Sequence, residues 1–112
     1  MKKFLVLYRA PASSYEQMMK ATPEQQKAGM DAWMKWSQSA ASSITDMGSP
    51  LGKAVRVDKT GEVSGSPNDL GGFSVMQGES KEALAAKMKD HPHYMTPGGW
   101  IEIVDMMAIP GM

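Results

Sequence analysis

The segment Asp90-His91-Pro92-His93 contains the only two histidines of the chain and is its clearest candidate for proton-transfer chemistry. Imidazole is the side chain best suited to exchanging protons near neutral pH. Because residues two apart in an extended segment point the same way, His91 and His93 could share one site, as base and orienting group or as two metal ligands. The alternative is that both cap the end of a helix or face water. We expect His93 to act as general acid/base, oriented by His91 and Asp90, and we assign no metal to the site.

A second candidate group consists of an ion pair and three aromatic side chains on predicted strands. Glu102 lies between two isoleucines, so it should point to the opposite face of the sheet, where a carboxylate needs a partner such as Arg9 or Arg56. An ion pair without a chemical role is the alternative, and a shift of one residue would turn Glu102 to the other face. The expected substrate contacts, with the aromatic residues as apolar walls, are Tyr8, Arg9, Phe73, Trp100 and Glu102.

Methionine is unusually frequent, with 12 residues in a chain of 112. Thioethers are soft metal ligands, so a copper site is one interpretation. The spacing favours another, because the methionines fall on predicted helices and strands, where adaptable side chains fill a core. We therefore expect core residues at Met30, Met34, Met76, Met88, Met106 and Met107, and core or interface anchors at Trp33, Trp36 and Trp100.

A long helix is the most clearly signalled element. Thr22-Pro23-Glu24-Gln25 combines a hydroxyl N-cap, a proline at the first helical position and a glutamine that can close a capping box. From Met30 to Ile44 apolar and small residues recur at spacings of three and four, so the helix should run to about Thr45 and stop before Gly48-Ser49-Pro50. The other helical segments are predicted at residues 13–20, starting at Ser13 or Ser14, and at residues 80–90, capped by Ser80.

The remaining apolar segments have the character of strands. Lys53 to Asp58 places Val55 and Val57 on one face, and Lys59-Thr60-Gly61 turns the chain back toward Glu62-Val63, which predicts a hairpin. Strands are predicted at residues 3–9, 53–58, 62–63, 70–77 and 100–109, with a small-residue loop from 64 to 69. With the helices, this order is the split βαβ pattern of a ferredoxin-like α+β fold with an antiparallel sheet, in a single domain spanning residues 1–112.

Both faces of the predicted outer strands are apolar. In the first strand Phe4, Val6 and Tyr8 oppose Leu5 and Leu7. Helices cover only one face of the antiparallel sheet in such a fold, so the other face needs a second layer. An identical sheet from another copy would supply it, which predicts a homodimer whose two sheets enclose a space.

Charge and composition exclude several classes of partner and site. The 12 basic and 12 acidic side chains give a net charge of zero, which argues against nucleic acid and against a polybasic membrane anchor. The chain has no cysteine, so disulfides and thiolate ligands are excluded. The apolar stretch Phe4 to Tyr8 is too short for a signal peptide. We therefore expect a cytoplasmic protein that does not span a membrane.

Short motifs along nearly the whole chain resemble the YCII-related family, which includes the DGPF-domain proteins. They are the strand Phe4-Leu5-Val6-Leu7-Tyr8, the turn Gly48-Ser49-Pro50-Leu51-Gly52, the strand entry Leu70-Gly71-Gly72-Phe73, residues 80–86, Pro92-His93 and Gly99-Trp100-Ile101-Glu102-Ile103. The resemblance implies a dimeric α+β barrel, in which two ferredoxin-like subunits meet sheet to sheet with a pocket near the interface in each.

Two departures from the family pattern bear on function. The DGPF tetrapeptide has no intact copy, and Ser64-Gly65-Ser66-Pro67 is the nearest stretch. YCII-type members often carry a histidine in the first helix that pairs with an aspartate, but this chain has Ala32, Trp33 or Trp36 in that region. That dyad is therefore not carried over, whereas Asp90, Pro92 and His93 match the family segment. One known activity in the family is a dehydrochlorinase that acts on a chlorinated aromatic compound.

We expect a small homodimer whose barrel pocket binds a small organic ligand, such as an aromatic molecule. The expected chemistry is proton transfer of the lyase or isomerase kind without an organic cofactor. The alternative is a non-catalytic ligand-binding or accessory dimer that uses the same pocket. The sequence does not identify the substrate.

Overall fold

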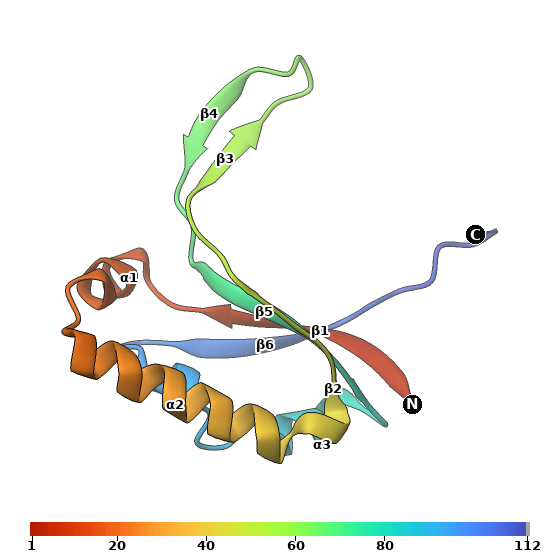
Figure 1. Cartoon of the computed structure of the whole chain (residues 1–112). Coiled ribbons are helices and arrows are strands. Elements are labelled where there is room, and N and C mark those ends of the chain that lie inside the picture. Colours follow the sequence, from red (N-terminus) through yellow and green to blue (C-terminus); the bar gives the residue numbers. More distant parts are fainter. Residues whose placement is uncertain (112) are drawn as a thin grey trace.

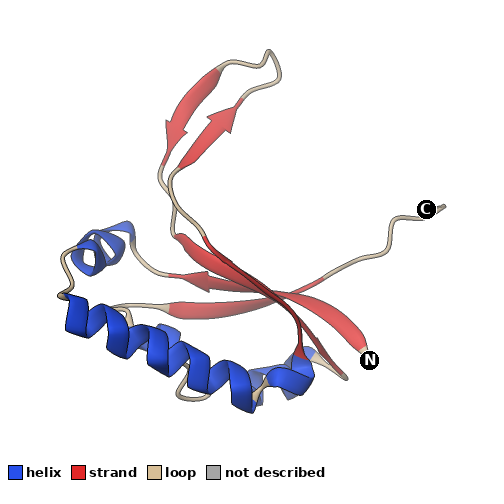
Figure 2. Ribbon diagram, in the orientation of Figure 1, coloured by secondary structure: helices blue, strands red, loops and turns tan. Residues whose placement is uncertain are grey.

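The computed structural model describes residues 1–111, which form an α+β domain with one main sheet (Figure 1). Its four strands are antiparallel and lie in the order β2-β5-β1-β6, with the helices on one face (Figure 2). This confirms the predicted fold class. The elements are β1 (Lys2–Arg9), α1 (Ala12–Met19), α2 (Pro23–Ser39), η1 (Ala41–Ser43), β2 (Ile44–Pro50), β3 (Ala54–Val57), β4 (Val63–Ser66), β5 (Leu70–Gly78), α3 (Lys81–Lys87), η2 (Pro92–Met95) and β6 (Trp100–Asp105).

Helix α2 begins where the sequence predicts but ends earlier. Thr22 Oγ1 accepts from the Gln25 N–H, and the Gln25 side chain accepts from the Thr22 N–H, so the capping box is present. The helix ends at Ser39, and the prediction that it runs to about Thr45 is wrong. Residues 44–50 instead form the edge strand β2, which pairs with β5. This pairing joins residues that are 22 to 32 positions apart, which a local periodicity cannot reveal.

Two predictions about the ends of the chain also need correction. The short helix α1 starts at Ala12 without a side-chain cap, because Ser14 lies inside it and donates its hydroxyl to the Pro97 carbonyl. Strand β6 ends at Asp105, so the predicted strand through Ile109 is too long. The segment beyond Asp105 leaves the sheet (Figure 1), and Met106 and Met107 are exposed rather than part of the core.

The core lies between the main sheet and the helices. Phe4, Val6 and Tyr8 of β1 point into it, together with Met76 of β5 and Leu84 of α3. Met88 and Met76 are buried, as expected. Met30 and Met34 of α2 are 66% and 57% exposed, so the prediction that they fill the core is wrong. Among the side chains of α2, Trp33 and Trp36 pack against the core.

The other face of the main sheet has no cover within the described residues. Leu5 of β1 lies between Val75 of β5 and Val104 of β6, and Leu7 pairs with Phe73 on the same face. Helices α2 and α3 are on the far side of this layer, and α1 lies beside the end of the sheet (Figure 1). We call this surface the open face. None of the helices in residues 1–111 has the length and hydropathy of a membrane-spanning segment.

The hairpin β3–β4 is confirmed where the sequence predicts it, although β4 continues to Ser66, into the predicted loop. Asp58 accepts from the N–H groups of Thr60 and Glu62 and holds its turn. Within the described chain the two strands pair only with each other. The hairpin stands away from the main sheet (Figure 2).

Candidate functional site

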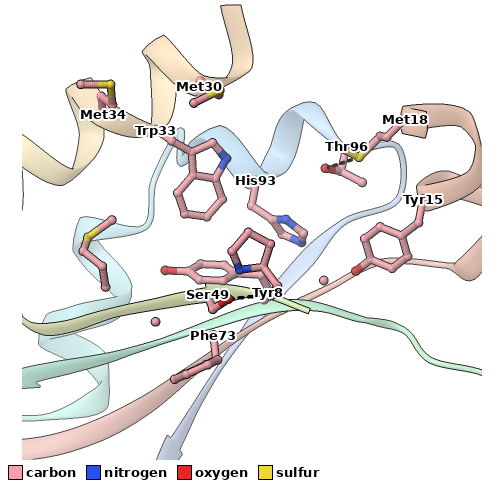
Figure 3. Close-up of a pocket in the computed structure, with 15 residues that line it drawn as sticks. Tyr8, Tyr15, Met18, Met30, Trp33, Met34, Ser49, Phe73, His93 and Thr96 are labelled. Atoms are coloured by element: carbon pink, nitrogen blue, oxygen red, sulfur yellow. Dashed lines mark hydrogen bonds between the residues drawn. The ribbon is translucent and has the colours of Figure 1, made fainter. Parts of the chain in front are cut away.

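A cavity of ≈ 470 Å³ lies between the helices and the β2–β5 edge of the sheet (Figure 3). This volume suits a small organic molecule. Figure 3 shows Tyr8, Trp33 and His93 grouped around it, with Tyr15 and Met18 of α1 at one side. The complete lining is Tyr8, Tyr15, Met18, Met30, Trp33, Met34, Met47, Gly48, Ser49, Pro50, Gly71, Gly72, Phe73, His93 and Thr96.

The cavity is apolar, and its hydroxyl groups are occupied by the protein itself. Tyr8 donates to Ser74 Oγ at 3.1 Å, Tyr15 donates to the Asp69 carbonyl at 2.8 Å, and the Thr96 hydroxyl contacts Met18 Sδ at 3.4 Å. Burial raises the pKa of Tyr8, although the Ser74 hydrogen bond lowers it in part, so the phenol stays protonated. Among the described residues, no lysine, arginine, aspartate or glutamate lines the cavity.

His93 is the imidazole in the lining, and one hydrogen bond of its ring fixes its tautomer. The side chain is buried, and Nε2 lies 2.7 Å from the Arg9 carbonyl oxygen. A carbonyl oxygen only accepts, so Nε2 carries the proton in the neutral ring and Nδ1 keeps its lone pair. Within residues 1–111 no hydrogen bond reaches Nδ1. Nδ1 is therefore the ring nitrogen with a free lone pair, in a residue that lines the cavity.

His91 is buried among aromatic rings and contacts the backbone of His93. Its Nδ1 accepts from the His93 backbone N–H at 2.9 Å, and its ring packs against Tyr8, Trp33 and Trp36 with centroids 5.1, 4.6 and 4.2 Å away. The residue is 1% exposed. Burial, and to a smaller extent the charge of His93, lowers the pKa of His91 to about 3. His91 is therefore neutral at physiological pH and suited to positioning His93.

The burial of His91 predicts a loss of folding stability in mild acid. Its pKa is lower in the folded than in the unfolded chain, so the unfolded chain binds the proton first as pH falls below about 6.5. Between pH 7.5 and pH 5 we expect this group to reduce the free energy of unfolding by about 1 to 2 kcal/mol. Urea unfolding curves at the two pH values measure the change.

The matched variant is His91→Asn, which does not titrate. An asparagine oxygen can accept the N–H two residues later, as in an Asx turn, so the contact with the His93 N–H can survive. Between pH 7.5 and pH 5 we expect the free energy of unfolding of this variant to fall by about 1 to 2 kcal/mol less than that of the wild type. Equal pH dependence in both proteins would show that His91 is not the buried neutral group described above.

The two histidines do not line the same cavity. They flank Pro92 at the start of the 3₁₀ helix η2, not in an extended strand, so the expectation that both rings point the same way is wrong. His93 lines the cavity, while His91 and Asp90 line a separate depression on the other side of η2. Asp90 itself is exposed and has φ of 60°. Among the described residues, no three potential ligands cluster as a metal site would require.

The predicted substrate contacts divide between the two faces of the sheet. Tyr8 lies in the cavity with His93. Phe73 contributes its main chain, because its ring points to the opposite side of the strand (Figure 3). Arg9 pairs with Glu102, as the sequence suggests, and also with Asp69. Trp100 donates to Glu102 at 3.4 Å on the open face. The sheet therefore separates Arg9, Trp100 and Glu102 from the cavity.

Sequence reasoning missed several residues of the lining. Met30 and Met34 of α2 were assigned to the core, and Met18, Met47 and Tyr15 were not singled out. The available signal was the helical stripe, which places Met30, Trp33 and Met34 on one side of α2. Flexible thioethers adapt to ligands of varied shape as readily as they fill a core, so the stripe alone does not separate the two roles.

No model of a known protein family matches the chain, and no curated protein matches it. Among solved structures, the chain is similar to 5-chloro-2-hydroxyhydroquinone dehydrochlorinase from Burkholderia phenoliruptrix AC1100, in complex with 2,5-dihydroxybenzoquinone. The two share 16% sequence identity with a TM-score of 0.52, over 89% of this chain and 90% of that one. This likeness agrees with the fold that the YCII-related resemblance implies, while membership of that family stays a prediction. The comparison establishes the fold of the chain as an α+β domain with an antiparallel sheet.

Proposed function

We propose that the protein binds a small uncharged aromatic molecule in the cavity and uses His93 for proton transfer of the lyase or isomerase kind. One observation carries this proposal. His93 lines an apolar cavity and keeps the lone pair of Nδ1 free of any hydrogen bond within the described residues, while its Nε2–H is anchored on the Arg9 carbonyl. A base that is fixed in orientation and reaches a water-poor site is what general base catalysis requires.

The lining defines the class of ligand. A carboxylate or phosphate that entered the cavity would lose its hydration without gaining a charged partner. This desolvation costs on the order of several kcal/mol. The Tyr8 and Trp33 rings lie perpendicular, with centroids 5.0 Å apart, and offer flat walls to an aromatic ring. The complex of the similar dehydrochlorinase with a dihydroxybenzoquinone supports the same class of ligand.

In an elimination of this kind, His93 Nδ1 would accept a proton from the substrate while the leaving group departs with its bonding electrons. The protonated imidazole would keep its Nε2–H bond to the Arg9 carbonyl, which also favours the cationic ring. This step needs one base and no organic cofactor. It is therefore compatible with a cavity that offers a single titratable imidazole.

A second candidate function is non-catalytic binding of the same class of ligand. It is favoured by the hydroxyl groups of Tyr8 and Tyr15, which donate to the protein and leave His93 without a partner acid in the cavity. Under this alternative the cavity holds its ligand without turnover, and His93 serves as a hydrogen-bond acceptor.

The protein would act as a homodimer joined at the open face. The row of apolar side chains on this face, including Leu5, Leu7 and Val75, needs a second layer, and an identical sheet provides one. The resemblance to dimeric α+β barrels supports the same arrangement. The cytoplasmic location and the lack of nucleic-acid partners remain predictions from charge and composition.

The binding proposal is tested by tryptophan fluorescence during titration with uncharged quinones, phenols and their chlorinated derivatives. Trp33 lines the cavity, so we expect these compounds to quench its emission, and benzoate to bind at least about tenfold more weakly because of its charge. Trp33→Phe should abolish the ligand-dependent change. Trp100→Phe is the matched control, because Trp100 lies on the open face.

The outcomes separate the possible sites. Loss of the signal in Trp100→Phe, with the signal kept in Trp33→Phe, would place the ligand at the open face and contradict the cavity assignment. Failure of every uncharged compound to bind would contradict the proposed ligand class. Conversion of a bound compound, followed as product or halide release, distinguishes the enzyme from the non-catalytic binder.

A further inference from the structure

We propose that the hairpin β3–β4 is an arm that grips a second copy of this chain, with its valine face buried on the partner. The inference rests on the homodimer in the proposed function and adds a second contact to the sheet-to-sheet interface. It is independent of the ligand and of the chemistry at His93.

The hairpin carries an apolar face that its own chain does not use. Alternation along the strands and the register Val57↔Val63 place Val55, Val57 and Val63 on one face. These valines are 64%, 60% and 58% exposed. The opposite face carries Arg56 and Ser64, which are paired with each other in the register. The arm is therefore amphipathic, with a solvent side and a side suited to packing.

An isolated hairpin of this size needs support. Two-stranded hairpins are at best marginally stable in water, and each strand here has four residues. Within the described chain β3 and β4 join no other strand. A partner that covers the valine face would supply the missing packing and would also remove exposed β-branched residues from water.

The position of the arm fits a partner at the open face. The hairpin continues from the edge formed by β2 and β5 and rises on the side of the sheet away from α2 and α3 (Figure 1). The open face lies on that same side. A second sheet that docks on the open face would therefore lie within reach of the arm.

The accessible surface area argues for a partner that covers more than the sheet. The described chain exposes 8144 Å², whereas a monomer of 12.2 kDa is expected to expose about 6,100 Å². The excess is about 2,000 Å², and an interface of standard size removes only about 800 Å² from each partner. The radius of gyration of 15.8 Å also exceeds the value of about 13 Å for a compact chain of this length. The extended hairpin and the segment beyond Asp105 both add to this excess (Figure 1), and contacts by the open face and the arm would remove part of it.

A second copy is the occupant that fits these surfaces. The valine face is uncharged, and the chain as a whole has no net charge, so two copies approach without repulsion. A twofold axis lets each copy provide both an arm and an open face, so that one closed assembly covers both surfaces of both chains. A different partner would have to carry a matching sheet and a matching arm site at once.

The test compares the dimer dissociation constant of the wild type with that of Val55→Thr/Val57→Thr/Val63→Thr, by sedimentation equilibrium. Threonine keeps the shape and the strand propensity of valine but has a hydroxyl group in place of one methyl group. We expect the triple variant to raise the dissociation constant at least tenfold. The matched control is Arg56→Thr/Ser64→Thr on the opposite face of the same hairpin, which should leave the constant within threefold of the wild-type value.

Each outcome bears on the arm separately from the ligand site. A wild-type dimer that the valine variant does not weaken overturns the arm and leaves the sheet-to-sheet dimer standing. A wild type that stays monomeric overturns both the dimer and the arm. Because Trp33 fluorescence reports on ligand binding in every variant, the cavity proposal is judged independently of the oligomeric state.

If the triple variant does not fold, a second measurement tests whether the valine face is buried. The natural chain has no cysteine, so Val57→Cys and Arg56→Cys each introduce a single thiol. Under dimeric conditions we expect a soluble alkylating reagent to modify the Val57→Cys protein at least tenfold more slowly than the Arg56→Cys protein. Equal rates in the two proteins would overturn the burial of the valine face.

Discussion

Replacement of His93 by glutamine is expected to lower the turnover of a cavity-bound substrate by at least about 100-fold, because general base catalysis by a positioned imidazole contributes on that scale. Glutamine has no basic nitrogen to replace the free Nδ1. Its side-chain amide can still donate to the Arg9 carbonyl in the place of Nε2–H. The variant therefore removes the base while keeping the contact that anchors this side chain to the end of β1. The measurements are kcat for a substrate found in the binding screen and the thermal midpoint.

The matched control is Tyr94→Phe, which lies next to His93 on η2 but is exposed and does not line the cavity. It should keep both turnover and stability. Turnover of His93→Gln within threefold of the wild type would remove His93 from the mechanism and favour the non-catalytic binder. A folded His93→Gln protein that also fails to bind would show that His93 holds the ligand as a hydrogen-bond partner. Loss of folding would show that the Arg9 contact is mainly structural.

The sequence predicted the fold correctly where local signals and tertiary packing agree. The capping box at Thr22 and Gln25 fixes the start of α2, and Ser80 caps α3 by accepting from the Ala83 N–H. The alternating valines at positions 55 and 57 fix the hairpin. In each case residues at most twelve positions apart determine the conformation, so a single sequence contains the information.

The site could be predicted only in part, because its geometry depends on contacts between distant segments. Tyr8 and His93 come together through the hydrogen bond from His93 Nε2 to the Arg9 carbonyl, across more than eighty residues. The two faces of β1 are both apolar, so the pattern alone could not show that Tyr8 faces the helices while Arg9 faces the open side. The pairing of Arg9 with Glu102 follows from opposite charges on adjacent strands, but its place outside the cavity does not.

The segment from residue 44 to residue 50 illustrates the limit most clearly. Ile44 continues the helical stripe of α2 and is at the same time a good strand residue, so the local pattern fits both. Pairing with β5 makes this segment a strand, and the register of this pairing is irregular between Asp46 and Ser49. This irregularity places Gly48 in a conformation with φ of 72°, and the Asp46 carboxylate accepts from its N–H at 2.8 Å. Gly48 is therefore the residue on which the course of β2 depends.

Gly48→Ala is accordingly expected to reduce the free energy of unfolding by roughly 3 kcal/mol, from a left-handed backbone and a steric clash together. A Cβ at this position would lie 1.8 Å from the Phe73 carbonyl oxygen and 2.6 Å from its carbonyl carbon, both in the backbone of β5. The backbone of one strand must shift, so β2 cannot keep its pairing with β5. Because Met47, Gly48 and Ser49 line the cavity, ligand binding should weaken as well.

Gly52→Ala is the matched control, since a Cβ there meets nothing within 4 Å and the residue has no positive φ. Its stability should stay within about 0.5 kcal/mol of the wild type, as for an ordinary surface substitution. Urea unfolding of both variants measures the difference. If Gly48→Ala were as stable as Gly52→Ala, the irregular pairing of β2 with β5 would be wrong, and with it the wall of the cavity that residues 47–50 form. A large difference in stability, with weaker ligand binding only in Gly48→Ala, would show that β2 shapes the site. This is the strand that the sequence pattern does not predict.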